Sequence, residues 1–176
     1  MNIVAIGAHP DDLEIFAYGF LAAASSRGDN LILGVATDGA AGGVNKGAEL
    51  ARQRADEARN GLAALGTPTL LDLPDGQLAD APNARNRIRD FIRNAAPDLV
   101  ITHAPEDYHP DHRALAAYVR DAAGFICPVL FCDTLMGVGF TPDYYIDISA
   151  HFAAKQKAIM AHHSQDPSRF ASASAI

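Results

Sequence analysis

The stretches Gly7-Ala8-His9-Pro10-Asp11-Asp12-Leu13-Glu14 and His109-Pro110-Asp111-His112 decide how the rest of the chain is interpreted. Each follows an apolar run that is typical of a strand, from Asn2 to Ala8 and from Asp98 to His103. Each also places a His directly before a Pro. Proline suits the first position of a helix, because the N–H that it lacks would have no partner there. Both stretches are therefore predicted to form the loop and helix start after a strand.

The residues around each Pro offer metal ligands three positions apart. Positions i and i+3 fall on one face of a helix start, so each stretch presents a pair of ligands on one side. Together, His9, Asp12 and His112 supply two imidazoles and one carboxylate. This is the ligand set of a catalytic metal site that keeps an open coordination position. The polar residues left for proton transfer are Asp11, His109 and Asp111.

The composition is that of a globular protein. Of the 176 residues, 49% are hydrophobic and 20% are charged, which predicts one domain over residues 1–176 with a sizeable core. The net charge of −7 argues against nucleic acid as a partner, because phosphate backbones are bound by Lys and Arg. No apolar run reaches the roughly 18 residues of a membrane span, and we expect a cytoplasmic protein. A homo-oligomer stays open.

Strand-like and helix-like segments alternate along the chain. The strands are too uniformly apolar to have a solvated face, which is typical of a parallel sheet covered on both sides. We predict an α/β, doubly wound fold with strand order 3-2-1-4-5, in which ligands bind beyond the carboxyl ends of the first and fourth strands. The predicted strands are Asn2–Ala8, Leu31–Thr37, Leu70–Leu73, Leu99–Thr102, Val129–Cys132 and Tyr144–Ile148. The predicted helices are Leu13–Ser26, Ala48–Leu65, Asn83–Ala95, Ala114–Ala123 and Ala150–His163.

Short motifs succeed one another from Ile3 to about Gln165. They are Ala8-His9-Pro10-Asp11-Asp12-Leu13-Glu14, Thr37-Asp38-Gly39, Arg54-x-x-Glu57 leading to Leu65-Gly66, Leu73-Pro74-Asp75-Gly76, His109-Pro110-Asp111-His112, Asp147-Ile148-Ser149, and Lys155 leading to His162-x-Ser164-Gln165. In this order they resemble the LmbE/PIG-L family of zinc-dependent N-deacetylases. The first and fifth motifs are specific together, and the others support them.

The resemblance implies a Rossmann-like, mainly parallel sheet and a hydrolase that removes the acetyl group from an N-acetylated amino sugar. The substrate would be a small molecule, often a glucosaminyl conjugate such as one of N-acetylglucosamine. The resemblance also implies zinc ligation by His9, Asp12 and His112, with Asp11 as the general base. Zinc can bring a bound water to a pKa of about 7, and another divalent metal such as Fe²⁺ would serve the same purpose.

Four further residues receive roles from the resemblance. It implies that His109 stabilises the oxyanion and that Asp111 holds the His109 ring. Arg54 and Asp75 match family positions near the sugar hydroxyls. Two structural interpretations stay open beside these: Arg54 and Glu57 have the i,i+3 spacing of an ion pair on a solvated helix face, and Asp75 has the place of a turn residue.

Two other functions compete with deacetylation. Two His and one carboxylate also suit a non-haem iron enzyme, although such oxygenases usually have an antiparallel barrel. A non-catalytic metal-binding or sugar-binding protein of the same fold is the second alternative. Members of the family commonly continue well beyond the motif that ends at Gln165, so we expect a more open pocket or a chain that lacks the usual C-terminal part. His103 has no motif around it and receives no role.

Overall fold

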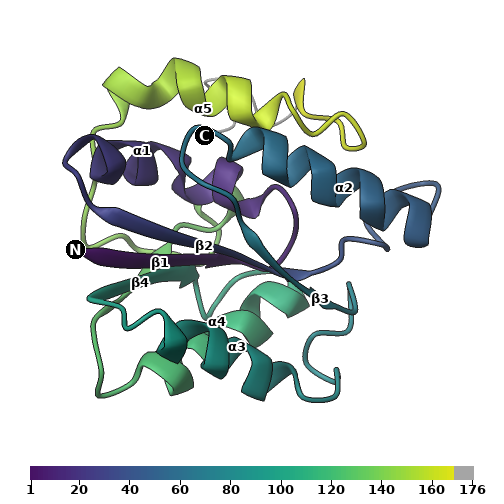
Figure 1. Ribbon diagram of the computed structural model, residues 1–176, viewed down its shortest axis with the longest axis horizontal. Coiled ribbons are helices and arrows are strands. Elements are labelled where there is room, and N and C mark those ends of the chain that lie inside the picture. Colours follow the sequence, from purple (N-terminus) through teal and green to yellow (C-terminus); the bar gives the residue numbers. More distant parts are fainter. Residues whose placement is uncertain (169–176) are drawn as a thin grey trace.

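The computed structural model describes residues 1–168 and has one five-stranded sheet between two layers of helices (Figure 1). All pairs of neighbouring strands are parallel, and the order β3-β2-β1-β4-β5 confirms the predicted doubly wound α/β topology. The observed strands lie within one or two residues of the predictions. They are β1 (Asn2–Gly7), β2 (Asn30–Thr37), β3 (Thr69–Leu73), β4 (Leu99–His103) and β5 (Val129–Cys132).

The helices have the predicted order, and all have shorter bounds than predicted except the fourth, which begins four residues earlier, at Pro110. They are α1 (Tyr18–Ser26), α2 (Ala48–Gly61), α3 (Ala84–Asn94), α4 (Pro110–Ala123) and α5 (Phe152–Ile159). A π-helical segment, Leu13–Ala17, precedes α1, and short 3₁₀ turns occupy Leu135–Gly137 and Ser149–His151. Within residues 1–168, none of these helices has the length and apolar character that crossing a bilayer requires.

The predicted strand Tyr144–Ile148 is wrong. Its alternation of apolar residues fits a strand, but the segment pairs with no strand of the described sheet, and Tyr145 is 87% exposed. Ile148 instead packs against α1, where a Cβ on Gly19 would lie 2.5 Å from the Ile148 side chain. Of the apolar residues in this segment, only Ile148 packs on α1, whereas Tyr144, Tyr145 and Ile146 are exposed.

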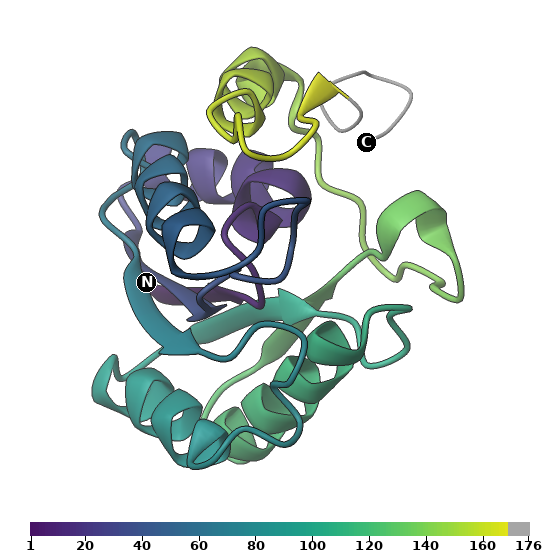
Figure 2. The same cartoon turned by 90° about the vertical axis from the view of Figure 1, so that its right-hand side faces the viewer.

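Side chains of β1 alternate between two cores, one on each face of the sheet. Val4 and Ile6 pack in one cluster with residues of α3 and α4, including Leu115, whereas Ile3 and Ala5 pack in the other with residues of α1. Figure 2 shows the two helical layers edge-on, with α3 and α4 on the opposite side of the sheet from α1, α2 and α5. Burial on both faces explains why the central strands are uniformly apolar.

Two buried glutamates hold the segment after α5. Glu14 Oε1 lies 2.8 Å from His162 Nε2, and both residues are buried. Burial raises the pKa of Glu14; burial alone would lower the pKa of His162, but the Glu14 carboxylate outweighs this effect and raises it. Glu57 accepts hydrogen bonds from the Ser164 backbone N–H at 2.8 Å and from its Oγ at 2.5 Å. These contacts place Gln165 beside the carboxyl end of the sheet.

Replacing Gly61 by Ala tests this close packing. A Cβ at Gly61 would lie 2.5 Å from Glu14 Oε1 and 3.1 Å from the Ala158 carbonyl oxygen. Alanine gains about 1 kcal/mol of helix propensity, but overpacking costs about 1–3 kcal/mol, and His162 holds the carboxylate in place. We expect Gly61→Ala to lower the free energy of unfolding in urea. The exposed neighbour Asn60→Ala, which adds propensity without a clash, should not, and equal stability of the two variants would contradict the packing described.

Candidate functional site

The site forms where the loops after β1 and β4 meet. These strands are parallel neighbours, with Ile3 paired to Leu99 and Ala5 to Ile101. Their carboxyl ends therefore lie side by side at one edge of the sheet. The helix starts after them carry the two His-Pro stretches, so residues about a hundred positions apart in sequence come into contact. This is the place where doubly wound sheets bind ligands.

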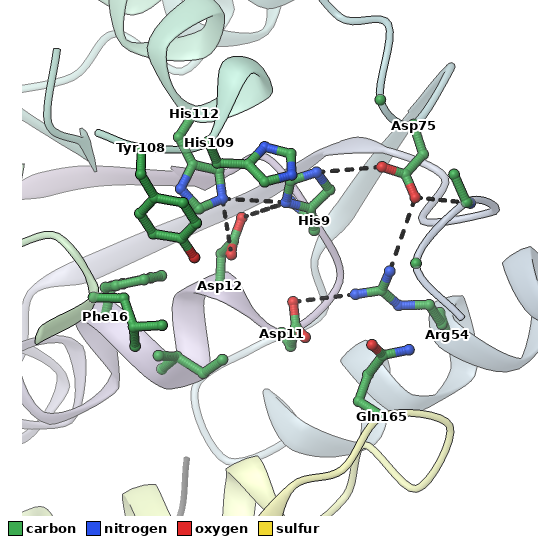
Figure 3. A pocket seen from close by; sticks show the side chains of 15 residues that line it. His9, Asp11, Asp12, Phe16, Arg54, Asp75, Tyr108, His109, His112 and Gln165 are labelled. Atoms are coloured by element: carbon green, nitrogen blue, oxygen red, sulfur yellow. Dashed lines mark hydrogen bonds and ion pairs between the residues drawn. The ribbon is translucent and has the colours of Figure 1, made fainter. Parts of the chain in front are cut away.

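Figure 3 shows the side chains of His9, Asp12 and His112 directed toward one another. His9 Nδ1 lies 3.2 Å from His112 Nε2 and 3.3 Å from Asp12 Oδ2, and His112 Nε2 lies 3.4 Å from Asp12 Oδ1. Donors on a tetrahedral ion with bonds of 2.0–2.2 Å are about 3.3–3.6 Å apart, and these separations, which involve both Asp12 oxygens, lie close to that range. Overlapping groups with donor atoms within 4.8 Å are His9–His109–His112, Asp12–His103–His112 and His9–Asp75–Asp111.

His103 belongs to this cluster, although no sequence motif surrounds it. Its Nε2 lies 3.0 Å from both the Ala8 backbone nitrogen and Asp12 Oδ2. Its ring stacks on His112 at a centroid separation of 3.7 Å and an interplanar angle of 9°. Its place as the last residue of β4, beside the end of β1, is the signal that could have identified it.

Asp107 is a second residue that the sequence did not reveal. Its buried Oδ2 lies 3.0 Å from His112 Nδ1, on the side of the ring away from the cluster, and its Oδ1 accepts a hydrogen bond from the His109 N–H at 2.8 Å. Burial alone would lower the pKa of His112, but Asp12 and Asp107 outweigh it and raise that pKa to about 9. A carboxylate on the far nitrogen fixes the orientation of a ligand imidazole.

Asp11 lies beside the cluster rather than in it. Its backbone has a φ of 154°, which residues with a side chain rarely adopt, and its Oδ1 lies 3.2 Å from Arg54 Nη2. Burial raises the pKa of Asp11, and Arg54 partly opposes this rise. A carboxylate therefore faces the cavity beside the candidate metal ligands without being one of them (Figure 3).

Asp111 has different partners from those that we expected. Its carboxylate accepts hydrogen bonds from the backbone N–H groups of Gly76, at 2.7 Å, and Leu78, at 3.0 Å, and its Oδ2 lies 3.3 Å from His9 Nε2. The contact with His109 runs through the Asp111 backbone, whose N–H donates to His109 Nδ1 at 3.2 Å. Asp111 therefore orients His9, and the helix backbone orients His109.

Arg54 and Asp75 also converge on the site. Arg54 is 3% exposed and donates to the carbonyl oxygens of Pro10 and Gly39, both at 3.2 Å. Asp75 accepts from the Ala41 N–H at 2.8 Å, and its Oδ1 lies 3.3 Å from His9 Nε2. Arg54 therefore does not form the solvated i,i+3 ion pair with Glu57. Its guanidinium points into the site, where Nη1 lies 4.0 Å from Asp75 Oδ2.

A cavity of about 330 Å³ opens over these side chains, at the small end of the range of about 300–1,000 Å³ that is typical of ligand sites. Every residue singled out from the sequence lines it except Asp111, which lies behind His9. Phe16, Tyr108, Leu135 and Gln165 add further walls. The cavity thus combines a cluster that fits a metal ion, an adjacent carboxylate and a buried guanidinium.

Comparisons with known proteins show similarity in sequence and in fold. The chain is 29% identical to a diacetylchitobiose deacetylase of Thermococcus kodakarensis, covering 94% of this chain and 70% of that protein. It is 30% identical to the "Uncharacterized deacetylase YaiS" of Escherichia coli, over 93% of this chain and 91% of that protein. The solved structure of N,N'-diacetylchitobiose deacetylase from Pyrococcus horikoshii, in complex with its inhibitor MPG, matches with a TM-score of 0.84 and 26% identity, over 96% of this chain and 72% of that one.

A model of a protein family also matches this chain. The family model described as "PIG-L: GlcNAc-PI de-N-acetylase" matches residues 4–123, which is more than half of the chain and includes both His-Pro stretches. The resemblance found in the motifs is thereby confirmed. This protein belongs to the PIG-L family.

Proposed function

We propose that this protein is a metal-dependent N-deacetylase, a hydrolase that cleaves the amide C–N bond of an N-acetylated amino sugar or its conjugate. The observation that carries the proposal is the convergence of His9, Asp12 and His112 to donor separations of 3.2–3.4 Å, with Asp11 beside them in one cavity. Membership of the PIG-L family and similarity to two proteins named deacetylases support it.

The ion would be held by His9, Asp12 and His112, and zinc or Fe²⁺ suits two imidazoles and a carboxylate. When bound, it supplies Lewis acidity and brings a water ligand to a pKa of about 7. His103 and Asp107 would be positioning residues. The first packs flat on the His112 ring, and the second contacts its far nitrogen, so the ring is held before the ion arrives.

Asp11 is the proposed general base. It would take the proton from the attacking water and deliver it to the leaving nitrogen, whose departure as an unprotonated amide anion is unfavourable. Its ion pair with Arg54 Nη2 keeps the carboxylate turned into the cavity. The same guanidinium and Asp75 are the proposed contacts for sugar hydroxyls, because both are fixed by backbone hydrogen bonds at the cavity wall.

His109 is the proposed donor to the oxyanion that develops on the acetyl oxygen. Its Nδ1 accepts the Asp111 backbone N–H, so in the neutral ring the hydrogen is on Nε2, and the ring can donate without being protonated. A carboxylate partner such as Asp111 would instead favour a protonated His109 ring. The neutral ring agrees with the lowered pKa of His109, which burial, His9 and His112 cause together.

Acetate release from N-acetylglucosamine and its conjugates tests the activity. We expect release with added zinc or Fe²⁺, loss of release after chelation, and recovery when metal is restored, since no other group in the cavity supplies a comparable Lewis acid. The reaction should proceed equally without oxygen. Turnover that requires oxygen would favour the iron oxygenase, and sugar binding without acetate release would favour the non-catalytic alternative.

His112→Ala tests the ligand set. We expect the variant to lose bound metal, because removing one of three protein ligands leaves two donors. Elemental analysis of purified protein gives the metal content directly, independently of activity. The exposed His163→Ala, after α5, is the matched control and should retain metal. A full equivalent of metal in His112→Ala would exclude the proposed site.

Asp11→Asn separates the base from the ligands. The amide keeps the size of the side chain but cannot accept a proton, so we expect kcat to fall by about 10²–10⁴ with metal content unchanged. Asp56→Asn, on the exposed face of α2, controls for the change in charge and should keep wild-type turnover. Near-normal turnover of Asp11→Asn would show that another group is the base.

A further inference from the structure

A second cavity, of about 510 Å³, lies on the α1 and α5 face of the sheet beside the edge strand β5. Its floor is formed by side chains of β4 and β5, and its sides by Phe16, Phe20 and the segment that joins β5 to α5. Figure 2 shows this segment running past the edge of the sheet. Phe16 lines both cavities, so its side chain is a wall that they share.

Lys155 contributes the cation of this cavity. It comes from α5, is only 4% exposed, and lines the cavity. No carboxylate of residues 1–168 forms an ion pair with it, and the Cys132 thiol lines the same cavity. Burial raises the pKa of that thiol to about 12, so Cys132 stays neutral and does not balance the ammonium. Burial also lowers the pKa of Lys155 to about 8, which leaves it charged at neutral pH.

An unbalanced buried ammonium is unfavourable, since a buried charge is normally paired. The lining contains two carboxylates, Asp133 and Asp143, but neither pairs with Lys155. Asp133 accepts the N–H of Thr134 at 2.7 Å instead. The rest of the lining is mainly apolar and aromatic, with a volume inside the range that is typical of small-molecule sites.

We propose that this second cavity binds a small ligand with an apolar body and a carboxylate or similar anionic group, which pairs with Lys155. The ligand could have two sources with this shared chemistry. It is either the aglycone of the sugar substrate, which rests on the proposed function and uses the shared wall at Phe16, or a separate amphiphile that does not depend on that function.

Two fluorescent probes with the same aromatic body test the site. 8-Anilinonaphthalene-1-sulfonate carries an anionic group, and N-phenyl-1-naphthylamine does not. Lys155→Met keeps the length and the apolar stem of the side chain. We expect this substitution to weaken binding of the sulfonate by about tenfold or more, the usual effect of losing a hydrogen bond to a charged group, and to change binding of the neutral probe less than twofold. Equal effects on both probes, or no effect, would overturn the proposal.

Lys157→Met, on the exposed side of α5, is the matched control and should bind both probes as the wild type does. Far-UV circular dichroism and thermal unfolding establish that each variant is folded. If Lys155→Met does not fold, the wild-type protein still decides: the sulfonate must bind at least tenfold more tightly than the neutral probe, and equal affinities would overturn the proposal.

Competition identifies the source of the ligand. If the aglycone occupies the cavity, 4-carboxyphenyl N-acetylglucosaminide displaces the sulfonate and the phenyl glycoside does not. If a separate amphiphile occupies the cavity, decanoate displaces the sulfonate and the carboxyphenyl glycoside does not. Displacement by neither carboxylate would overturn the site. Because these are binding measurements, failure of deacetylation leaves their outcome unaffected, and the two proposals stand or fall separately.

Discussion

The parallel pairing of β1 with β4 is the constraint on which the rest of the structure depends. It aligns the ends of two strands that are separated by about a hundred residues, and each end leads through a short loop with polar residues into a helix start. Both strands are central and buried on both faces, so a shift of one against the other would break two cores at once. The donor separations around His9 and His112 result from this fixed register.

The site contains many buried ionisable groups, and hydrogen bonds from backbone N–H groups stabilise the charges of two of its carboxylates. Asp111 and Asp75 accept N–H groups from the loops after β3 and β2, so part of their charge is balanced by peptide dipoles. Burial opposes the ionisation of Asp12, but His112, His103 and His9 outweigh it and hold the pKa of that carboxyl well below its usual range. A cluster of this kind is arranged in advance for a cation.

The sequence predicted the strand order and eight candidate residues, of which all but Asp111 line one cavity. Six of the eight lie in the two His-Pro stretches, which combine ligand types, a helix signal and a preceding strand, whereas Arg54 and Asp75 came from the resemblance to the family. His103 and Asp107 escaped detection, since a single His or Asp carries no spacing, and their contacts appear only once β4 is placed beside β1. The partner of Asp111 was unpredictable for a similar reason: its acceptor contacts are backbone amides, which leave no trace in residue type. Tyr144–Ile148 misled because most of its apolar residues are exposed, and only Ile148 packs on a helix.

The π-helical segment Leu13–Ala17 has a consequence for how this protein can change over evolutionary time. A π turn contains one more residue than an α turn, and this one carries both Glu14, which contacts His162, and Phe16, which lines the two cavities. Losing one residue would restore α-helical winding and rotate α1 by about 100° relative to the loop before it. Substitutions in this stretch keep the extra residue, whereas a single-residue deletion would change the orientation of α1 relative to the loop that carries His9 and Asp12.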